Sequence, residues 1–279
     1  GSSPRLPPMV HLPVKYLVAA GLAVLLAGCA TPADSAEPTE PPPGVTQAPA
    51  TTSTPSAAPS PSADSATTTA AAAAPDCSVV NCVAITYDDG PSPLTNQLLD
   101  AYIQRGAVAT FFVHGPKVAN DPATVLRAFD AGMEIGNHSS NHPNLTLQSA
   151  DVVAQEISDT QQEVAKVTGQ APRLLRPPYG ETSATVNQIA GQQGLSVINW
   201  TDGPADWENR DAATVVNLTL ARVRPGAIIL MHDTHQWTVD AAPAIIDGLR
   251  QQGYELVTVS QLIGNPQPGQ FYTDGQAPA

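Results

Sequence analysis

The strongest constraint on the fold is a repeated alternation of short apolar runs with amphipathic helical patterns. It recurs about seven times between Cys82 and Gly264. The apolar runs are continuous, which is typical of parallel strands that helices bury on both faces. We therefore predict an α/β fold with a parallel sheet covered by helices, either open or closed into a barrel. The expected strands cover 83–87, 109–113, 133–136, 173–175, 195–200, 227–231 and 254–259.

Polar side chains follow the carboxyl ends of these expected strands. In folds of this class, that edge of the sheet is where active sites are built. The pattern therefore predicts that residues far apart in the chain gather in one cleft. They are Asp88, Asp89, His138, His142, Arg176, Asp206 and His232.

Two adjacent carboxylates, Asp88 and Asp89, stand where the first expected strand runs into Gly90-Pro91. Neighbouring carboxylates repel each other unless a cation, an arginine or a shared proton compensates. Taken alone, the stretch also fits an Asp-Gly turn that closes a hairpin. The other residues at the same edge decide between the two interpretations.

A metal site is the favoured interpretation. His138 and His142 are four residues apart, so one helical turn would place both imidazoles on one face. Surface or hydrogen-bonded histidines also occur at this spacing. With one carboxylate of the Asp pair, however, they form a set typical of a catalytic divalent ion that keeps open positions for water and substrate. Zn²⁺ is our first choice, with Co²⁺, Ni²⁺ or Mn²⁺ as alternatives.

The second carboxylate of the pair would then be free to act as general base on a metal-bound water that attacks a carbonyl. We expect Arg176 to keep this base ionised and oriented through a bidentate contact, although a surface salt bridge is the alternative for Arg176. The backbone N–H of Tyr179 is the expected oxyanion donor, because Pro177 and Pro178 have no N–H.

His232 is the expected acid that protonates the leaving group. A nearby carboxylate would favour its imidazolium form, and we favour Asp206 over the adjacent Asp233 for that role. Trp207 and Tyr179 offer flat surfaces for stacking on sugar rings. Core packing is the alternative for any single aromatic residue.

The choice between core packing and sugar stacking differs for two further tryptophans. For Trp200, core packing and sugar stacking are equally favoured. For Trp237, stacking is favoured because the residue falls in an expected polar loop.

Five motifs in this chain resemble, in the same order, those of polysaccharide deacetylases with the NodB homology domain, carbohydrate esterase family 4. The resemblance covers essentially all of Cys82 to Gly264. It implies a distorted (β/α) barrel with about seven parallel strands, and a metal-dependent hydrolase of amide bonds that removes acetyl groups, usually from N-acetylglucosamine units. The motifs are Thr86-Tyr87-Asp88-Asp89-Gly90, His138-Ser139-Ser140-Asn141-His142, Arg176-Pro177-Pro178-Tyr179, Asp206-Trp207 and Leu230-Met231-His232.

The resemblance also orders the two adjacent carboxylates, which the residues alone leave open. It implies that Asp88 is the base and that Asp89, His138 and His142 are the metal ligands. Tyr87 stands where the family more often has Phe, which is a conservative departure.

The same resemblance implies the Tyr179 N–H as oxyanion donor, His232 as acid and Leu230 as part of the acetyl pocket. The fourth motif departs from the family pattern. The family often has Asp three residues before the Asp of Asp-Trp, and Gly203 stands there in this chain. Asp206 is therefore the residue expected to tune the acid.

The N-terminal part predicts export. In segment 1–29, an apolar run too short for a comfortable transmembrane helix ends at Leu26-Ala27-Gly28-Cys29, which resembles a bacterial lipobox. We expect lipidation of Cys29 and attachment to the outer face of the cytoplasmic membrane or the cell wall. A plain secretory signal is the alternative. Segment 30–76 is rich in Pro, Ala, Ser and Thr and is expected to be a disordered tether.

The expected catalytic domain covers 77–265, followed by a flexible tail at 266–279. Cys77 and Cys82 enclose a short loop before the first strand, and an exported location permits a disulfide between them. We expect a monomer.

Composition limits the partners. The chain has 279 residues and a net charge of −13, with 12 Lys+Arg against 25 Asp+Glu, which argues against nucleic acid. The expected function is deacetylation of N-acetylated cell-wall glycan, in particular of N-acetylglucosamine in peptidoglycan. The alternatives are a chitin-oligomer deacetylase or acetylxylan esterase, and a glycan-binding lipoprotein without catalysis.

Overall fold

Strand β1 (Cys82–Gly90) lies inside the sheet and is buried along almost its whole length. The computed structural model describes residues 74–278. Strands β2 (Thr110–Val113) and β6 (Ile228–His232) run parallel to β1 on its two sides. The continuous apolar sequence of these strands fits this placement, because such strands face packed side chains on both surfaces.

The described strands form a sheet in the order β6-β1-β2-β3-β4-β5-β8, with β7 paired to β1. Every strand pair in this part of the chain is parallel. Isolated bridges join the segments that follow β5 and β8 to the region of β6, and so bring the two sheet edges together. The predicted distorted (β/α) barrel is confirmed. The remaining strands are β3 (Glu134–Asn137), β4 (Leu174–Leu175), β5 (Ser196–Ile198), β7 (Glu255–Leu256) and β8 (Phe271–Tyr272).

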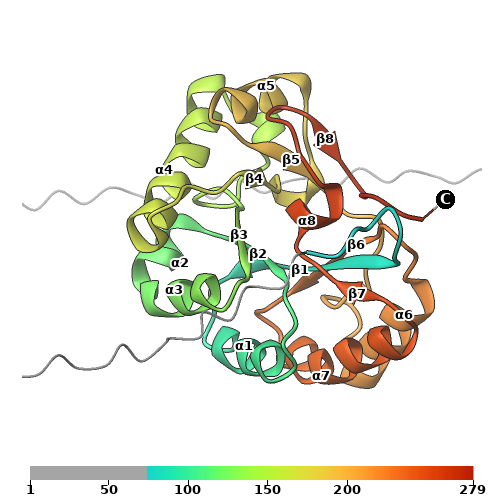
Figure 1. Cartoon of the computed structure of the whole chain (residues 1–279). Coiled ribbons are helices and arrows are strands. Elements are labelled where there is room, and N and C mark those ends of the chain that lie inside the picture. Colours follow the sequence, from blue (N-terminus) through green and yellow to red (C-terminus); the bar gives the residue numbers. More distant parts are fainter. Residues whose placement is uncertain (1–73, 279) are drawn as a thin grey trace, which may run out of the picture. The chain divides into compact units, whose positions relative to one another are not determined.

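Helices surround this sheet (Figure 1). Asp121 caps α3 by accepting from the Thr124 N–H, and Ser149 caps α4 by accepting from the Val152 N–H. Within 74–278, no helix has the length and apolar character needed to cross a membrane. The helices are α1 (Thr95–Gln104), α2 (Gly115–Asn120), α3 (Pro122–Asp130), α4 (Ala150–Thr168), α5 (Ala184–Gln192), α6 (Ala212–Arg222), α7 (Gln236–Gln251) and α8 (Val259–Ile263).

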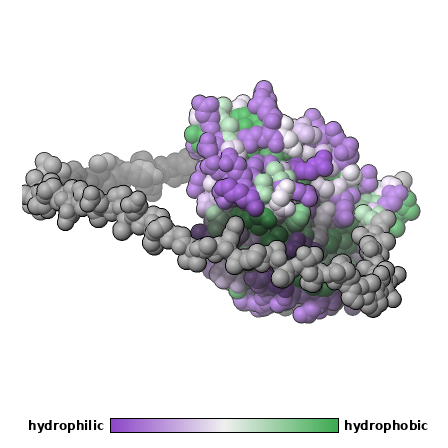
Figure 2. Space-filling model, turned by 60° about the vertical axis from the view of Figure 1, so that its left-hand side comes forward, coloured by the Kyte–Doolittle hydropathy of each residue, from purple (hydrophilic) through white to green (hydrophobic). Residues whose placement is uncertain are grey.

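Alternate residues of β1 belong to different apolar clusters. Val83, Ile85 and Tyr87 pack in the large cluster, while Cys82 and Ala84 belong to a second one. Because successive side chains of a strand point to opposite faces, Asp88 lies on the same face of β1 as Cys82 and Ala84. On the face drawn in Figure 2, hydrophilic residues predominate on the upper and lower parts, with hydrophobic residues between them.

The structure corrects several expectations. Segment 266–279, expected as a flexible tail, contributes β8, which pairs with β5. The expected strand 254–259 is shorter, because β7 ends at Leu256 and α8 follows. Helix α7 begins at Gln236, so Trp237 lies on a helix and not in a loop.

The disulfide between Cys77 and Cys82 is present, with their Cα atoms 5.4 Å apart. The signal segment, the lipidation of Cys29 and most of the tether fall outside the described residues.

Candidate active site and metal centre

The carboxyl ends of the central strands surround a cavity of about 400 Å³. In the register of β1 and β6, Asp88 lies directly opposite His232. Two other expected site residues, Arg176 and Asp206, are fully buried outside the cavity. Arg176 contacts Asp88, and Asp206 contacts His232. The expected residues that line the cavity are Asp88, Asp89, His138, His142, Tyr179, Trp207, Leu230 and His232.

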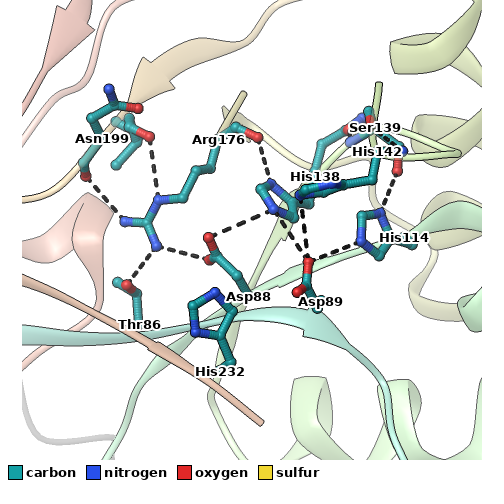
Figure 3. Close-up of polar contacts among 12 residues, drawn as sticks. Thr86, Asp88, Asp89, His114, His138, Ser139, His142, Arg176, Asn199 and His232 are labelled. Carbon is teal, nitrogen blue, oxygen red and sulfur yellow. Dashed lines mark hydrogen bonds and ion pairs between the residues drawn. The ribbon is translucent and has the colours of Figure 1, made fainter. Parts of the chain in front are cut away.

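Four side chains converge beside this cavity (Figure 3). The Oδ1 atom of Asp89 lies 3.1 Å from Nε2 of His114, 3.5 Å from Nε2 of His138 and 3.7 Å from Nε2 of His142. The ligand atoms of all four residues lie within 4.8 Å of one another. One carboxylate and three imidazoles form a donor set that suits a divalent first-row metal ion.

The hydrogen bonds of the rings support this assignment. Nδ1 of His138 lies 2.7 Å from the carbonyl oxygen of Arg176 and must donate to it, because a carbonyl can only accept. In the neutral ring, Nε2 then presents a lone pair to the carboxylate of Asp89. Burial lowers the pKa of His138 to about 4, so the ring is neutral at pH 7. A cation placed between these lone pairs would satisfy both of them.

The electrostatics of Asp89 agree with a cation site. Burial alone would raise the pKa of this carboxyl group. The close contact with His114 and the nearby His138 and His232 outweigh burial and hold its pKa well below its usual range. Asp89 is therefore an anion at every pH at which the protein would act.

Backbone conformation, and not a helix, brings the ligands together. His138 and His142 lie in a loop after β3, so the expected helical turn is absent. Asp89, Ser139 and His142 have φ values of 71°, 65° and 59°, in the left-handed region that non-glycine residues rarely adopt. The N–H of His142 donates to Oγ of Ser139 at 3.1 Å, which holds the loop in this form. Such conformations often mark functional sites.

Asp88 is buried against Arg176. The Nη1 atom of Arg176 donates to Oδ1 of Asp88 at 2.9 Å and to Oγ1 of Thr86 at 2.6 Å. The expected bidentate contact is wrong. Nη2 donates instead to the carbonyl oxygen of Asn199 at 3.0 Å, and Nε to that of Ile198 at 3.3 Å. Only Nη1 therefore donates to the carboxylate of Asp88. Nη2 and Nε donate to backbone carbonyls at the end of β5 and so hold the guanidinium there.

His232 pairs with Asp206. Nδ1 of His232 lies 2.8 Å from Oδ1 of Asp206, and its backbone N–H donates to Oδ2 at 2.8 Å. Burial alone would lower the pKa of His232, but the hydrogen bond and charge of Asp206 raise it to about 9. Asp233, the competing choice, points elsewhere and accepts from Oγ1 of Thr95 at 2.5 Å.

The aromatic residues divide into two groups. Trp207 is 44% exposed and packs edge-on against His232 at the cavity wall. Tyr179 is 65% exposed, with its ring 4.6 Å from that of His142. Trp237 differs from the expectation of sugar stacking, because its Nε1 donates to the carbonyl oxygen of Asp206 at 2.7 Å. Trp200 lines the cavity, and its ring centre lies 5.7 Å from Cζ of Arg176.

His114 was not expected at the site. It follows β2 directly, so it stands at the same edge as the other site residues. This position directly after an expected strand is the sequence signal that could have identified His114 as a site residue. The residue belongs to none of the five motifs, and its partners Asp89 and Ser139 are distant in sequence.

The profile described as "Polysaccharide deacetylase" matches residues 76–198. The chitooligosaccharide deacetylase of Bradyrhizobium sp. (strain ANU 289) is 34% identical over 203 residues, which cover 67% of this chain and 93% of that protein. This chain belongs to the polysaccharide deacetylase family. The solved structure of "T48 deacetylase with substrate" gives a TM-score of 0.69 at 37% identity, covering 71% of this chain and all of that one.

Other members of the family are named for peptidoglycan. Peptidoglycan-N-acetylmuramic acid deacetylase PdaC of Bacillus subtilis (strain 168) is 42% identical over 181 residues, 64% of this chain. Peptidoglycan-N-acetylglucosamine deacetylase PgdA of Listeria monocytogenes is 41% identical over 194 residues, 69% of this chain. This chain spans only 38% and 41% of the lengths of these two relatives.

Proposed function

We propose that this chain is a metal-dependent deacetylase of N-acetylated cell-wall glycan, acting on N-acetylglucosamine units of peptidoglycan. The observation that carries the proposal is the arrangement in one cavity of a metal-type ligand group, a buried carboxylate and a histidine with a raised pKa. The names of PdaC and PgdA support peptidoglycan as the polymer.

Asp89, His138 and His142 would hold the metal ion. Once bound, the ion would supply a Lewis acid that polarises the acetyl carbonyl and makes water more acidic. We favour Zn²⁺ among the divalent ions that such a ligand set accepts.

Asp88 is the proposed general base. Its Oδ1 atom is occupied by Arg176, while Oδ2 faces the ligand group, 3.6 Å from Nε2 of His138. A water between substrate and Asp88 would give its proton to Oδ2 while attacking the carbonyl carbon. Arg176 compensates the charge of the buried carboxylate and fixes its orientation.

His232 is the proposed general acid. Its Nδ1 is held by Asp206, so Nε2 is the atom available toward the cavity. With a pKa near 9, the ring is protonated at neutral pH and can pass a proton to the leaving amine as the carbon–nitrogen bond breaks. Base and acid thus stand on the adjacent strands β1 and β6.

The cavity walls would bind the substrate. Leu230 is buried in the lining and offers an apolar surface for the acetyl methyl group. The backbone N–H of Tyr179 is the proposed oxyanion donor, and the exposed ring of Trp207 offers a stacking surface for a sugar.

Two alternatives keep the site and change its use. The chitooligosaccharide deacetylase of Bradyrhizobium supports a chitin oligomer as substrate, and an acetylxylan esterase would use the same chemistry. A glycan-binding protein without catalysis is less favoured, because binding alone needs no base and acid in the same cavity as a metal-type group.

Acetate release tests these proposals. Re-N-acetylated peptidoglycan, chitin oligomers and acetylxylan are each incubated with the full chain, with chelator and with metal restored. Peptidoglycan should release acetate fastest and only with metal. Asp88→Asn should abolish turnover and retain metal. Loss of metal in Asp88→Asn would show that the roles of Asp88 and Asp89 are reversed, and no release from any substrate would leave the binding function.

We also propose that the protein is a monomer anchored through lipid on Cys29 outside the cytoplasm. The lipobox-like sequence supports this placement. Incorporation of labelled fatty acid in the native host, and its loss in Cys29→Ala, tests the anchor. Light scattering of the purified protein tests the oligomeric state.

A further inference from the structure

His114 has no part in the function proposed above, yet its ring lies within the ligand group. It is 6% exposed, and its ring centre lies 5.1 Å from that of His138 and 5.4 Å from that of His142. We propose that His114 is a fourth protein ligand of the metal ion, with Asp89, His138 and His142. The inference rests on the proposed function only in that it takes a metal ion to bind here.

The hydrogen bonds of His114 match those of a known type of metal ligand. Its Nδ1 lies 3.1 Å from the carbonyl oxygen of Ser139 and must donate to it. In the neutral ring, Nε2 then directs a lone pair at Oδ1 of Asp89, 3.1 Å away. His138 is held in the same way, with Nδ1 on a backbone carbonyl and Nε2 toward Asp89. A backbone carbonyl on the far nitrogen is the usual device that orients a ligating histidine.

The competing role for His114 is that of an outer partner of Asp89. In that role the ring would be doubly protonated and would donate to both Ser139 and Asp89. A metal ion on Asp89 makes this form unfavourable, because the imidazolium and the divalent ion would face each other within the same buried group. The neutral, ligating ring avoids this repulsion.

The position of His114 also determines which side of the ligand group stays open. Asp89 and His142 line both the catalytic cavity and a second cavity of about 390 Å³. Among the residues described, Asp88 and His232 line only the first of these cavities and His114 only the second. As a ligand, His114 would close the group on the side of the second cavity and leave its open face toward the proposed base and acid.

Four protein ligands would saturate a tetrahedral ion, as in structural zinc sites. An ion that also polarises substrate here must therefore accept five or six ligands. The metal site of this chain would differ in this respect from a centre with three protein ligands.

The crystal structure of the full chain loaded with Zn²⁺ tests the inference directly. Nε2 of His114 should lie about 2.0–2.1 Å from the ion, the usual distance for a zinc-bound imidazole. An ion bound by Asp89, His138 and His142 while His114 donates to Asp89 would overturn the inference. This test needs no variant and is unaffected by any folding defect.

Metal affinity gives a second test. Competition with a chromophoric chelator should show that His114→Gln weakens Zn²⁺ binding by more than about 100-fold, because loss of an outer partner typically costs 10- to 100-fold. His235→Gln is the matched control: His235 lies near His232 but outside the ligand group, and its variant should bind Zn²⁺ as the wild type does. A smaller loss in His114→Gln overturns the inference.

The two levels of proposal fail separately. A protein that releases acetate but leaves His114 off the metal keeps its proposed function and loses this inference. A protein that binds Zn²⁺ through His114 but releases no acetate keeps this inference and loses the proposed function.

Discussion

Nδ1 of His232 lies 2.8 Å from Oδ1 of Asp206, and the backbone N–H of His232 donates to the other oxygen of the same carboxylate. The side chain of Asp206 is completely buried and also accepts from Oγ1 of Thr238 at 2.7 Å. The ring therefore has a fixed orientation, with a buried carboxylate behind it. This pairing raises the pKa of His232 to about 9.

Asp206→Asn should lower the pKa of His232, because the amide removes the charge that favours the imidazolium. A histidine donates a proton only below its pKa, so the alkaline limit of deacetylation should move to lower pH. The rate at neutral pH should fall by about 100-fold or more, the usual contribution of a positioned acid. Nuclear magnetic resonance of the His232 ring in the metal-free protein and the pH profile of acetate release measure the two effects.

The control for this prediction is Asp202→Asn. Asp202 lies in the same loop, but its carboxylate pairs with Arg222 at 3.6 Å, whereas His232 is paired with Asp206. Its variant should leave the His232 titration unchanged. Equal titration curves in wild type and Asp206→Asn would contradict the proposed role of Asp206.

The buried Arg176 should matter for stability as well as for catalysis. Arg176→Met leaves the carboxylate of Asp88 buried without its partner, which typically costs about 3–5 kcal/mol. Urea denaturation at constant slope would report this as a lower midpoint. Arg222→Met, which removes an exposed ion pair with Asp202, should cost no more than about 1 kcal/mol. Similar losses in both variants would mean that Asp88 gains little from Arg176.

Much of the site could be predicted from sequence because strand order and strand ends constrain it strongly. Once the apolar runs are parallel strands, the residues after them must share one edge. Asp88 and Asp89 were placed with His138, His142 and His232 in this way. The part that failed depends on backbone detail: the two histidines were expected on a helical turn, and left-handed residues in a loop bring them together instead.

The sequence also does not reveal which acceptor each nitrogen of Arg176 contacts, or where very short strands form. The bidentate contact of Arg176 was wrong because carbonyls at the end of β5 compete for its donors. Strand β8 is two residues long and lies in a polar segment, so no apolar run marks it. His114 was missed because its partners are brought close only by the fold.

Metal binding should stabilise the domain. An ion that binds only the folded state adds about 2.7 kcal/mol to the free energy of unfolding at 100 times its dissociation constant. Urea denaturation with and without Zn²⁺ measures this increment, which chelator should remove. His138→Gln should abolish the increment and His235→Gln should retain it. An increment that persists in His138→Gln would place the ion elsewhere.

Asp233 should make stability depend on pH. Its side chain is completely buried, Oδ2 accepts from Thr95, and Oδ1 has no partner among the described residues. Burial raises its pKa from 3.8 to about 7, and the nearby Asp88 and Asp89 add to the effect. Between these two values the folded state binds a proton that the unfolded state has lost. The free energy of unfolding should therefore fall as pH rises from about 4 to about 7.

Asp233→Asn should remove this dependence, because the amide stays neutral and its oxygen can still accept from Thr95. Relative to wild type, the variant should gain stability from pH 4.5 to about pH 7 and show no further gain up to pH 8, in urea denaturation of the metal-free protein. Asp240→Asn, an exposed change on α7, is the control and should run parallel to wild type. If Asp233→Asn also runs parallel, Asp233 is ionised in the folded state throughout this range. Its burial would then have to be compensated by a donor to Oδ1.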